Sequence, residues 1–270
     1  MSDAPNALLQ DYLVQLSSRG VSHVPLNDVA KQLLGLGGQP PRSSRAASSS
    51  AVPAASKAER LAALAAQAEK SSACRALSTF GDTLVFSSGS PDAEVMFIGD
   101  APGAEEERQR EPFVGPAGQL LTKVVQAMGL TRASVYISNI CKFRPIVNGG
   151  QPKGSRDRPP TKPEIDACLP FVMGEIEIVQ PRIIVALGAL AANGLGIEGD
   201  ILQLRGSVQD FRGTPLIVTY QPSYLLTCES DDGGGVKEKR LLWEHMLRIM
   251  EHLGLPISVK QRAYFSKATA

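Results

Sequence analysis

Four short apolar runs alternate with longer segments of helical periodicity in this chain of 270 residues. Each run is rich in β-branched residues and short enough for a strand, and the runs span residues 94–99, 134–138, 182–187 and 215–219. The helical patterns span residues 117–128, 162–179, 190–195 and 237–253. Strands that alternate with helices predict an α/β fold, with a parallel sheet covered by helices on both faces.

The part of the chain before these runs has a different composition. Apolar residues at helical spacing predict a short amphipathic helix at 6–17, whereas the segment "GLGGQPPRSSRAASSSAVPAAS" is typical of a flexible linker. An alanine-rich segment, "KAERLAALAAQAEK", then predicts a helix that leads into the α/β domain. We therefore divide the chain into an N-terminal helical segment (1–34), a linker (35–57), an α/β domain (58–258) and a C-terminal tail (259–270).

Charge and cysteine content limit the partners, the metal sites and the cellular location that we expect for this chain. The formal net charge is +1, so a nucleic-acid contact would need a local basic patch. The four cysteines include no CxxC pair, which argues against a disulfide framework or a zinc site and fits a reducing cytoplasm. No apolar run approaches the roughly 18 residues of a membrane span, and no signal peptide is recognisable. We expect a cytoplasmic monomer without membrane contacts.

Polar residues stand where three of the predicted strands end. Asp100 follows the first strand, Asn139 follows the second, and Gln221 follows the fourth just before Pro222. The carboxyl ends of parallel strands meet at one edge of a sheet, which is where ligands bind in open α/β folds. This position predicts a site, although Gln221 alone fits equally well as a turn residue that faces water.

The loop after the first strand carries two further candidates. Pro102 and Gly103 form a tight turn whose backbone N–H groups can bind an anion or a carbonyl oxygen. The loop matches neither a dinucleotide-binding motif nor a P-loop. Phe113 lies in the rigid segment "PFVGPAG", either as a core residue or as a stacking platform for a flat ring. The intervening "EEERQRE" is typical of a solvated face.

A basic segment follows the second strand. Residues 139–162 hold one acid, Asp157, and six bases, giving a local charge of +5 from Lys142, Arg144, Lys153, Arg156, Arg158 and Lys162. The segment fits phosphate contacts and a solvated loop equally well. At its start, the amide of Asn139 offers one acceptor and two donors, which suits a nucleobase edge that carries both N–H and C=O.

Four motifs in order, "GDAPG", "REPFVGPAGQLL", "YISNICKFRP" and "QPSYLL", resemble those of the uracil-DNA glycosylase superfamily, most closely family 4, over about residues 83–253. The resemblance implies a three-layer α/β/α sandwich around a four-stranded parallel sheet. It also implies hydrolysis of the N-glycosidic bond of deoxyuridine in single- or double-stranded DNA, as in base excision repair.

The resemblance implies a role for each matching position. Asp100 stands where the family usually has a glutamate that positions or activates water, Asn139 reads uracil, and Phe113 stacks on the flipped base. Pro102 and Gly103 contact the substrate. In "QPSYLL", Ser223 approaches a phosphate and Leu225 fills the gap left by the extruded nucleotide. Further DNA contacts are predicted for Lys142 and Arg144.

Two departures from the family pattern matter. Gln221 replaces a histidine that supports the leaving uracil at O2, and a neutral amide donor predicts a weaker enzyme. Family 4 commonly binds a [4Fe–4S] cluster through four cysteines. Cys74 and Cys168 match two of them, but Ser71 and Phe143 stand at the other two positions. We expect no cluster, no other metal and no cofactor.

Two other functions fit parts of the sequence. One is a DNA- or lesion-binding protein that keeps a base pocket but turns over little. The other is a glycosylase whose preference has shifted, for instance toward deaminated purines. The presence of Asp100 argues against the first, and the presence of Asn139 argues against the second.

Overall fold

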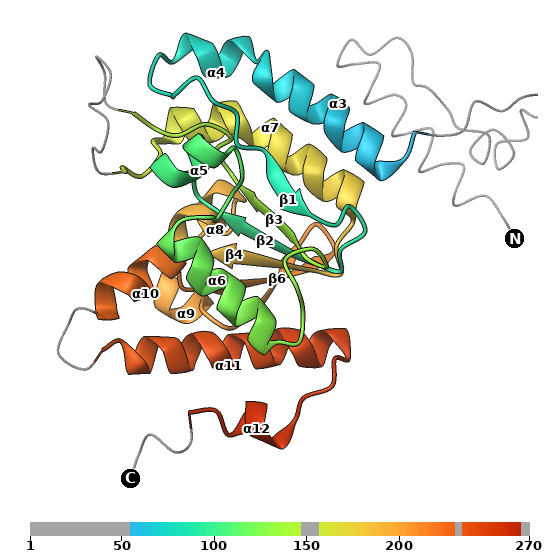
Figure 1. Cartoon of the computed structure of the whole chain (residues 1–270), viewed down its shortest axis with the longest axis vertical. Helices are drawn as coiled ribbons and strands as arrows, with labels where there is room; N and C mark the ends of the chain where they lie inside the picture. Colours follow the sequence, from blue (N-terminus) through green and yellow to red (C-terminus); the bar gives the residue numbers. More distant parts are fainter. Residues whose placement is uncertain (1–54, 147–156, 230–233, 266–270) are drawn as a thin grey trace, which may run out of the picture. The chain divides into compact units, whose positions relative to one another are not determined.

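The computed structural model describes residues 55–146, 157–229 and 234–265 (Figure 1). The predicted helix at 6–17, most of the linker and the end of the C-terminal tail lie outside these residues, so the proposed domain boundaries stay a prediction. The described residues form a six-stranded sheet with the order β1-β3-β2-β4-β6-β5.

The centre of the sheet consists of the four predicted strands. β2 (Val95–Gly99), β3 (Tyr136–Asn139), β4 (Ile183–Leu187) and β6 (Thr214–Thr219) run parallel to one another. Two antiparallel edge strands, β1 (Ser87–Gly89) and β5 (Val208–Phe211), raise the count from four to six. These edge strands are only partly buried and lack an apolar run, which is why the sequence pattern missed them.

Helices cover both faces of the sheet, so the predicted α/β/α class is confirmed (Figure 1). The residues of α3 (Lys57–Glu69), α7 (Lys162–Val179) and α8 (Ala189–Gly194) pack on one face. Those of α6 (Pro116–Ala127) and α11 (Val236–Leu253) pack on the other. The remaining helices are short: α4 (Ser72–Ala76), α5 (Ala104–Gln109), α9 (Ile201–Leu204), α10 (Pro222–Glu229) and α12 (Val259–Arg262).

Side chains of the central strands alternate between two apolar cores. In β2, Val95 and Phe97 pack toward α6 and α11, while Met96 and Ile98 pack toward α3 and α7. Because both faces are buried, β2 and β4 are apolar throughout, and the polar residues Asp100 and Gln221 follow the ends of β2 and β6. This arrangement places the polar strand ends at the edge of the sheet.

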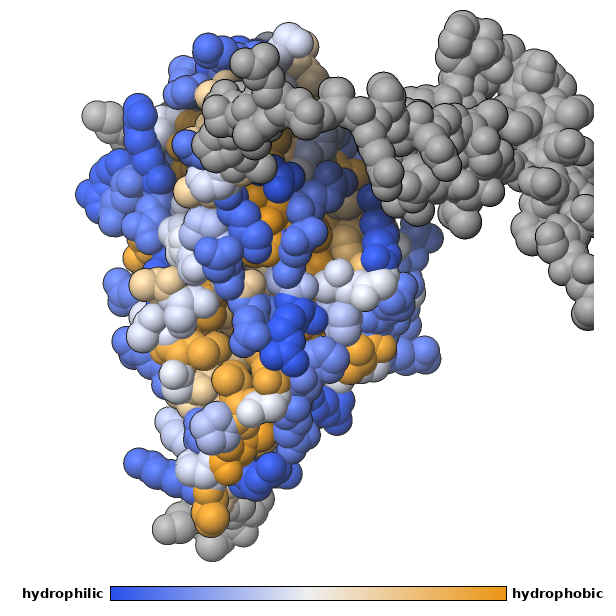
Figure 2. Space-filling view, turned by 90° about the vertical axis from the view of Figure 1, so that its right-hand side faces the viewer, coloured by the Kyte–Doolittle hydropathy of each residue, from blue (hydrophilic) through white to orange (hydrophobic). Residues whose placement is uncertain are grey.

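The surface seen in Figure 2 is mostly hydrophilic, and its hydrophobic residues gather toward the end where α11 and α12 lie. A shallow groove is lined there by Met128, Leu130, Leu255 and Ile257. Among the described residues, no helix is both long enough and apolar enough to cross a membrane.

Candidate active site

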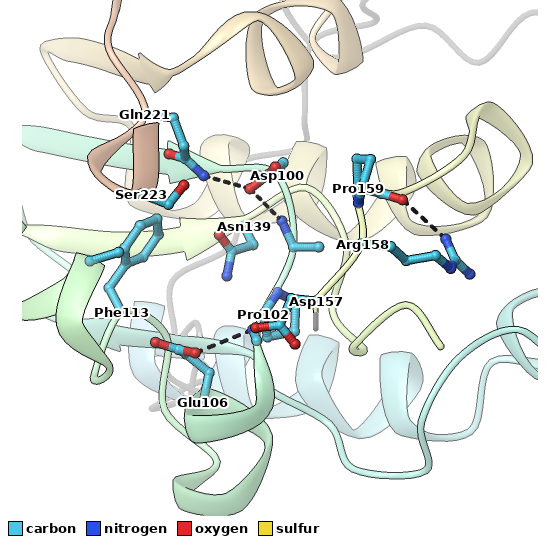
Figure 3. Close-up of a pocket in the computed structure, with 13 residues that line it drawn as sticks. Asp100, Pro102, Glu106, Phe113, Asn139, Asp157, Arg158, Pro159, Gln221 and Ser223 are labelled. Carbon is cyan, nitrogen blue, oxygen red and sulfur yellow. Dashed lines mark hydrogen bonds between the residues drawn. The ribbon is translucent and has the colours of Figure 1, made fainter. Parts of the chain in front are cut away.

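A cavity of about 350 Å³ opens at the carboxyl ends of the parallel strands (Figure 3). Gly99 at the end of β2 pairs with Asn139 at the end of β3, and Gln221 follows β6 on the same edge. Seven of the predicted site residues line this cavity: Asp100, Pro102, Gly103, Phe113, Asn139, Gln221 and Ser223.

The carboxylate of Asp100 is held by two donors. The backbone N–H of Ala101 donates to Oδ1 at 3.0 Å, and Nε2 of Gln221 donates to the same oxygen at 2.6 Å (Figure 3). Burial raises the pKa of Asp100, and these hydrogen bonds oppose the rise because they stabilise the charged form. Both bonds go to Oδ1, which leaves Oδ2 available to a water molecule or a ligand.

Two amide oxygens at the cavity are buried without a partner among the described residues, Oδ1 of Asn139 and Oε1 of Gln221. Gly99 lies beneath this part of the site, and a Cβ atom there would collide with the Asn139 amide and the Phe113 ring. A residue without a side chain is therefore required at position 99 for the amide and the ring to approach each other. Buried acceptors without partners are costly, so this pair predicts a ligand that carries N–H donors.

Phe113 adopts a left-handed backbone conformation, with a φ of 56°. Glu106 holds the loop around it, since its carboxylate accepts the N–H groups of Val114 at 3.0 Å and Gly115 at 2.9 Å. The same carboxylate accepts the N–H of Gly103 at 3.2 Å, so one side chain ties the turn after β2 to the Phe113 loop.

Arg132 holds the other side of this loop. Its guanidinium donates to the carbonyl oxygens of Pro112 at 2.8 Å and Phe113 at 2.9 Å. Gly118 permits the close packing, because a Cβ atom there would overlap the main chain of Phe113. A non-glycine residue with positive φ costs free energy, and here several contacts fix it beside a cavity.

Comparisons with known proteins agree with this geometry. Residues 86–247 match the family described as the Uracil DNA glycosylase superfamily. The chain belongs to that superfamily. It is 39% identical over 152 residues to a type-4 uracil-DNA glycosylase of Thermotoga maritima, which covers 55% of this chain and 74% of the relative. For the type-4 enzyme of Archaeoglobus fulgidus, the identity is 41% over 147 residues, covering 51% of this chain and 69% of the relative.

Within this uracil-DNA glycosylase fold, the structure contradicts three predicted DNA contacts. Lys142 is completely buried, and its Nζ lies 2.5 Å from Oε2 of Glu175. Arg144 is 7% exposed and pairs with Asp157 at 2.7 Å. Leu225 is completely buried in the core on the α6 and α11 side. None of these three side chains reaches the surface sufficiently to contact DNA.

The basic segment as a whole is largely neutralised. Arg158 pairs with Glu164 at 2.6 Å, and Lys162 pairs with Asp166 at 2.9 Å. Lys153 and Arg156 lie outside the described residues. The four described bases of this segment are therefore ion-paired within the chain, which argues against a continuous phosphate-binding patch.

Sequence reasoning missed the residues that organise the site. The charged segment "EEERQRE" predicts a solvated face, yet Glu106 within it accepts hydrogen bonds from the Phe113 loop. Asp157 and Arg158 also line the cavity. A signal for Glu106 was present: an acid three residues after Gly103 fits the N3 position of a capping box. Arg158 belongs to the predicted basic segment, whereas nothing local to Asp157 identifies it as a site residue.

Three cysteines lie together where the family resemblance implied iron. Cys74, Cys141 and Cys168 pack with Phe143, and the Sγ atoms of Cys74 and Cys168 are 3.6 Å apart. Hydrogen bonding and burial raise the pKa of Cys74, and the hydrogen bond with Cys141 is the main cause that raises the pKa of Cys168 to about 12.

These residues do not fit a [4Fe–4S] cluster. Such a cluster needs four thiolates, whereas Phe143 fills part of this space and Cys228 lies on α10. Among the residues that the structure describes, no group of three or more His, Cys, Asp or Glu side chains is arranged to hold a metal ion.

Proposed function

We propose that this chain is a uracil-DNA glycosylase that hydrolyses the N-glycosidic bond of deoxyuridine in DNA and releases uracil. One observation carries the proposal: the unpartnered amide oxygen of Asn139 lies at the same cavity as the Phe113 ring and the Asp100 carboxylate. Membership of the superfamily supports it independently.

The pocket can read the base through Asn139 and Phe113. The Oδ1 atom of Asn139 accepts a hydrogen bond from N3–H of uracil, and its Nδ2 donates to O4. Cytosine presents the opposite pattern at these two atoms and is rejected. The ring of Phe113, fixed by Glu106 and Arg132, offers its face to a flat base.

The bond-breaking step uses the free oxygen of Asp100. A water oxygen forms a bond to C1′ of the sugar while the bond from C1′ to N1 of uracil breaks. The electron pair of the broken bond leaves with uracil, and the water proton passes to Oδ2 of Asp100. Pro102 and Gly103 border the cavity, and the N–H of Gly103 is donated to Glu106, so this turn positions the base through its shape.

Gln221 mainly serves to hold the Asp100 carboxylate through a hydrogen bond. One Nε2 hydrogen is used by Asp100, so at most one remains for O2 of the leaving uracil. A neutral donor that is shared in this way stabilises the developing anion less than a dedicated donor does. We therefore expect the bond-breaking step to be slower with Gln221 than it would be with a histidine at this position.

A second candidate rests on the Oε1 atom of Gln221. This buried acceptor has no partner among the described residues and belongs to a cavity-lining side chain. A base that carries an N–H group at that point, such as a deaminated purine, satisfies it better than uracil O2. A glycosylase with a shifted base preference is thus the alternative to compare with uracil excision.

DNA is the proposed partner, and Ser223 at the mouth of the cavity is the proposed phosphate contact. The use of single- or double-stranded DNA, the cytoplasmic location and the monomeric state remain proposals that rest on the sequence alone.

The test uses labelled oligonucleotides, single- and double-stranded, that contain one uracil, cytosine, hypoxanthine or xanthine. Abasic sites are revealed by alkaline cleavage, and the released base is identified by chromatography. We expect uracil release that falls strongly in Asp100→Asn. Preferential release of hypoxanthine or xanthine would favour the shifted preference. Tight binding without release of any base would instead identify a DNA-binding protein.

A further inference from the structure

The burial of Leu225 leaves the predicted wedge position without a side chain at the surface. Leu225 is completely buried beside Tyr220 and Leu242, so it can reach DNA only if α10 detaches. The residue before it is different: Tyr224 is 48% exposed. Tyr224 also follows Ser223 directly, and Ser223 lines the cavity.

Tyr224 is the outer member of a stack of aromatic rings. Its ring lies 6.0 Å from that of Tyr220, with an interplanar angle of 10°. The ring of Tyr220 in turn lies 6.3 Å from that of His245, at 6°. Tyr220 and His245 are both buried. The exposed ring therefore rests on a rigid support that keeps its outer face available.

A positive charge lies beside this stack. The guanidinium carbon of Arg205 is 4.1 Å from the centroid of the Tyr220 ring. The Nε atom of Arg205 is buried without a hydrogen-bond partner, and among the described residues no carboxylate forms an ion pair with this side chain. Lys142 and Arg144, in contrast, each have a carboxylate partner within the chain.

We propose that Tyr224 and Arg205 form a DNA-contacting surface beside the cavity, in which Tyr224 fills the gap in the base stack and Arg205 binds a backbone phosphate. This inference rests on the proposed function. Extrusion of a nucleotide leaves its neighbours unstacked, and an aromatic ring replaces the lost contact. A guanidinium fixed on an aromatic face matches the charge and geometry of a phosphate.

The first test measures base stacking without cleavage. The full chain is mixed with a duplex that carries 2-aminopurine next to 2′-fluoro-deoxyuridine, whose glycosidic bond resists hydrolysis. We expect Tyr224→Ala to lose most of the fluorescence change that the wild type produces, and Tyr224→Phe to keep it. Tyr264→Ala is the matched control, because Tyr264 is also exposed but packs on Trp243 and does not adjoin a residue that lines the cavity.

The second test compares excision rates. Tyr224→Ala is expected to lower the single-turnover rate about tenfold on duplex DNA and much less on single strands, where no gap needs filling. Equal rates for Tyr224→Ala and wild type on both substrates, with an unchanged fluorescence signal, would overturn the role of Tyr224. If the wild type releases no base but the fluorescence results hold, the proposed function fails while this surface stands.

The third test addresses Arg205 through salt. Each phosphate contact contributes about 0.9 to the slope of log affinity against log salt concentration for duplex DNA. Arg205→Gln should lower the magnitude of that slope by about 1, and Arg205→Lys should restore it. An unchanged slope in Arg205→Gln would exclude the phosphate contact.

Discussion

The cavity and the buried polar network of Lys142, Glu175, Ser138 and Tyr136 differ in how completely their polar groups are hydrogen-bonded. At the cavity, Asn139 Oδ1 and Gln221 Oε1 are buried without partners among the described residues. In the network, Nζ of Lys142 donates to Glu175 at 2.5 Å and to Ser138 at 2.6 Å, and the Tyr136 hydroxyl donates to Glu175 at 3.1 Å.

Asn139 belongs to both regions. Its main-chain oxygen accepts a hydrogen bond from Nζ of Lys142 at 2.8 Å, while its side chain lines the cavity. Burial alone therefore does not reveal a functional polar residue. Groups with a complete set of partners hold the strand end in place, and groups that lack a partner are available to a substrate.

The largest effect should follow the loss of the carboxylate that accepts the water proton. Asp100→Asn is expected to lower the single-turnover rate of uracil release by about 10² to 10⁴, the range typical of a general base. The free energy of unfolding should stay the same or rise, because a buried charge is removed. Quench-flow and urea denaturation measure the two quantities, and a rate within a factor of two of wild type would contradict the role.

Substitutions in the buried polar network should lower the stability of the fold and leave the rate of uracil release nearly unchanged. Glu175→Gln leaves the buried ammonium of Lys142 without its counter-charge, so the free energy of unfolding should fall by about 3 to 5 kcal/mol. The rate per folded molecule should change little. The double variant Lys142→Met with Glu175→Leu serves as the control and should recover much of the stability. A large rate loss in the fully folded double variant would show that the network acts in catalysis.

The sequence predicts the strand-end residues of the cavity but not the contacts of the buried polar network. The central strands and the strand-end residues Asp100, Asn139 and Gln221 were predictable, because apolar runs and their polar ends are local signals. The ion pair of Lys142 with Glu175 joins residues 33 positions apart and has no local signature. The choice between Leu225 and its neighbour depends on how α10 rotates against α6 and α11, which only packing decides.

Loosening the loop that carries Phe113 should lower the rate of uracil release by an intermediate amount. Glu106→Ala removes three hydrogen bonds that fix this loop, so the single-turnover rate should fall about tenfold. Glu106→Gln keeps one acceptor oxygen and should recover part of the rate, which a purely structural defect would not do. Glu105→Ala is the control, because this half-buried neighbour on the same helix accepts from Arg108 and Gln109 and from none of the loop N–H groups. An equal loss there would remove Glu106 from its positioning role.

Gln221 should give the smallest effect, visible mainly in pH dependence. The active form of Asp100 is the carboxylate, and burial raises its pKa above the ordinary value of 3.8 while Gln221 lowers it. Gln221→Ala removes the lowering contribution, so the acid limb of the pH–rate profile should move to higher pH. At neutral pH the rate should fall only about threefold to tenfold. An unmoved acid limb would leave Gln221 as a turn residue.

The role of the Asn139 amide in binding uracil is tested by the single-turnover rate of uracil release by Asn139→Asp, measured where the variant is fully folded. A carboxylate cannot donate to O4 and repels the developing uracil anion. We predict a loss of about a hundredfold or more in the folded variant, with a lower thermal midpoint because a carboxylate is added at a buried position. An unchanged rate, or a loss fully explained by unfolding, would contradict the claim that the unpartnered amide of Asn139 serves the substrate.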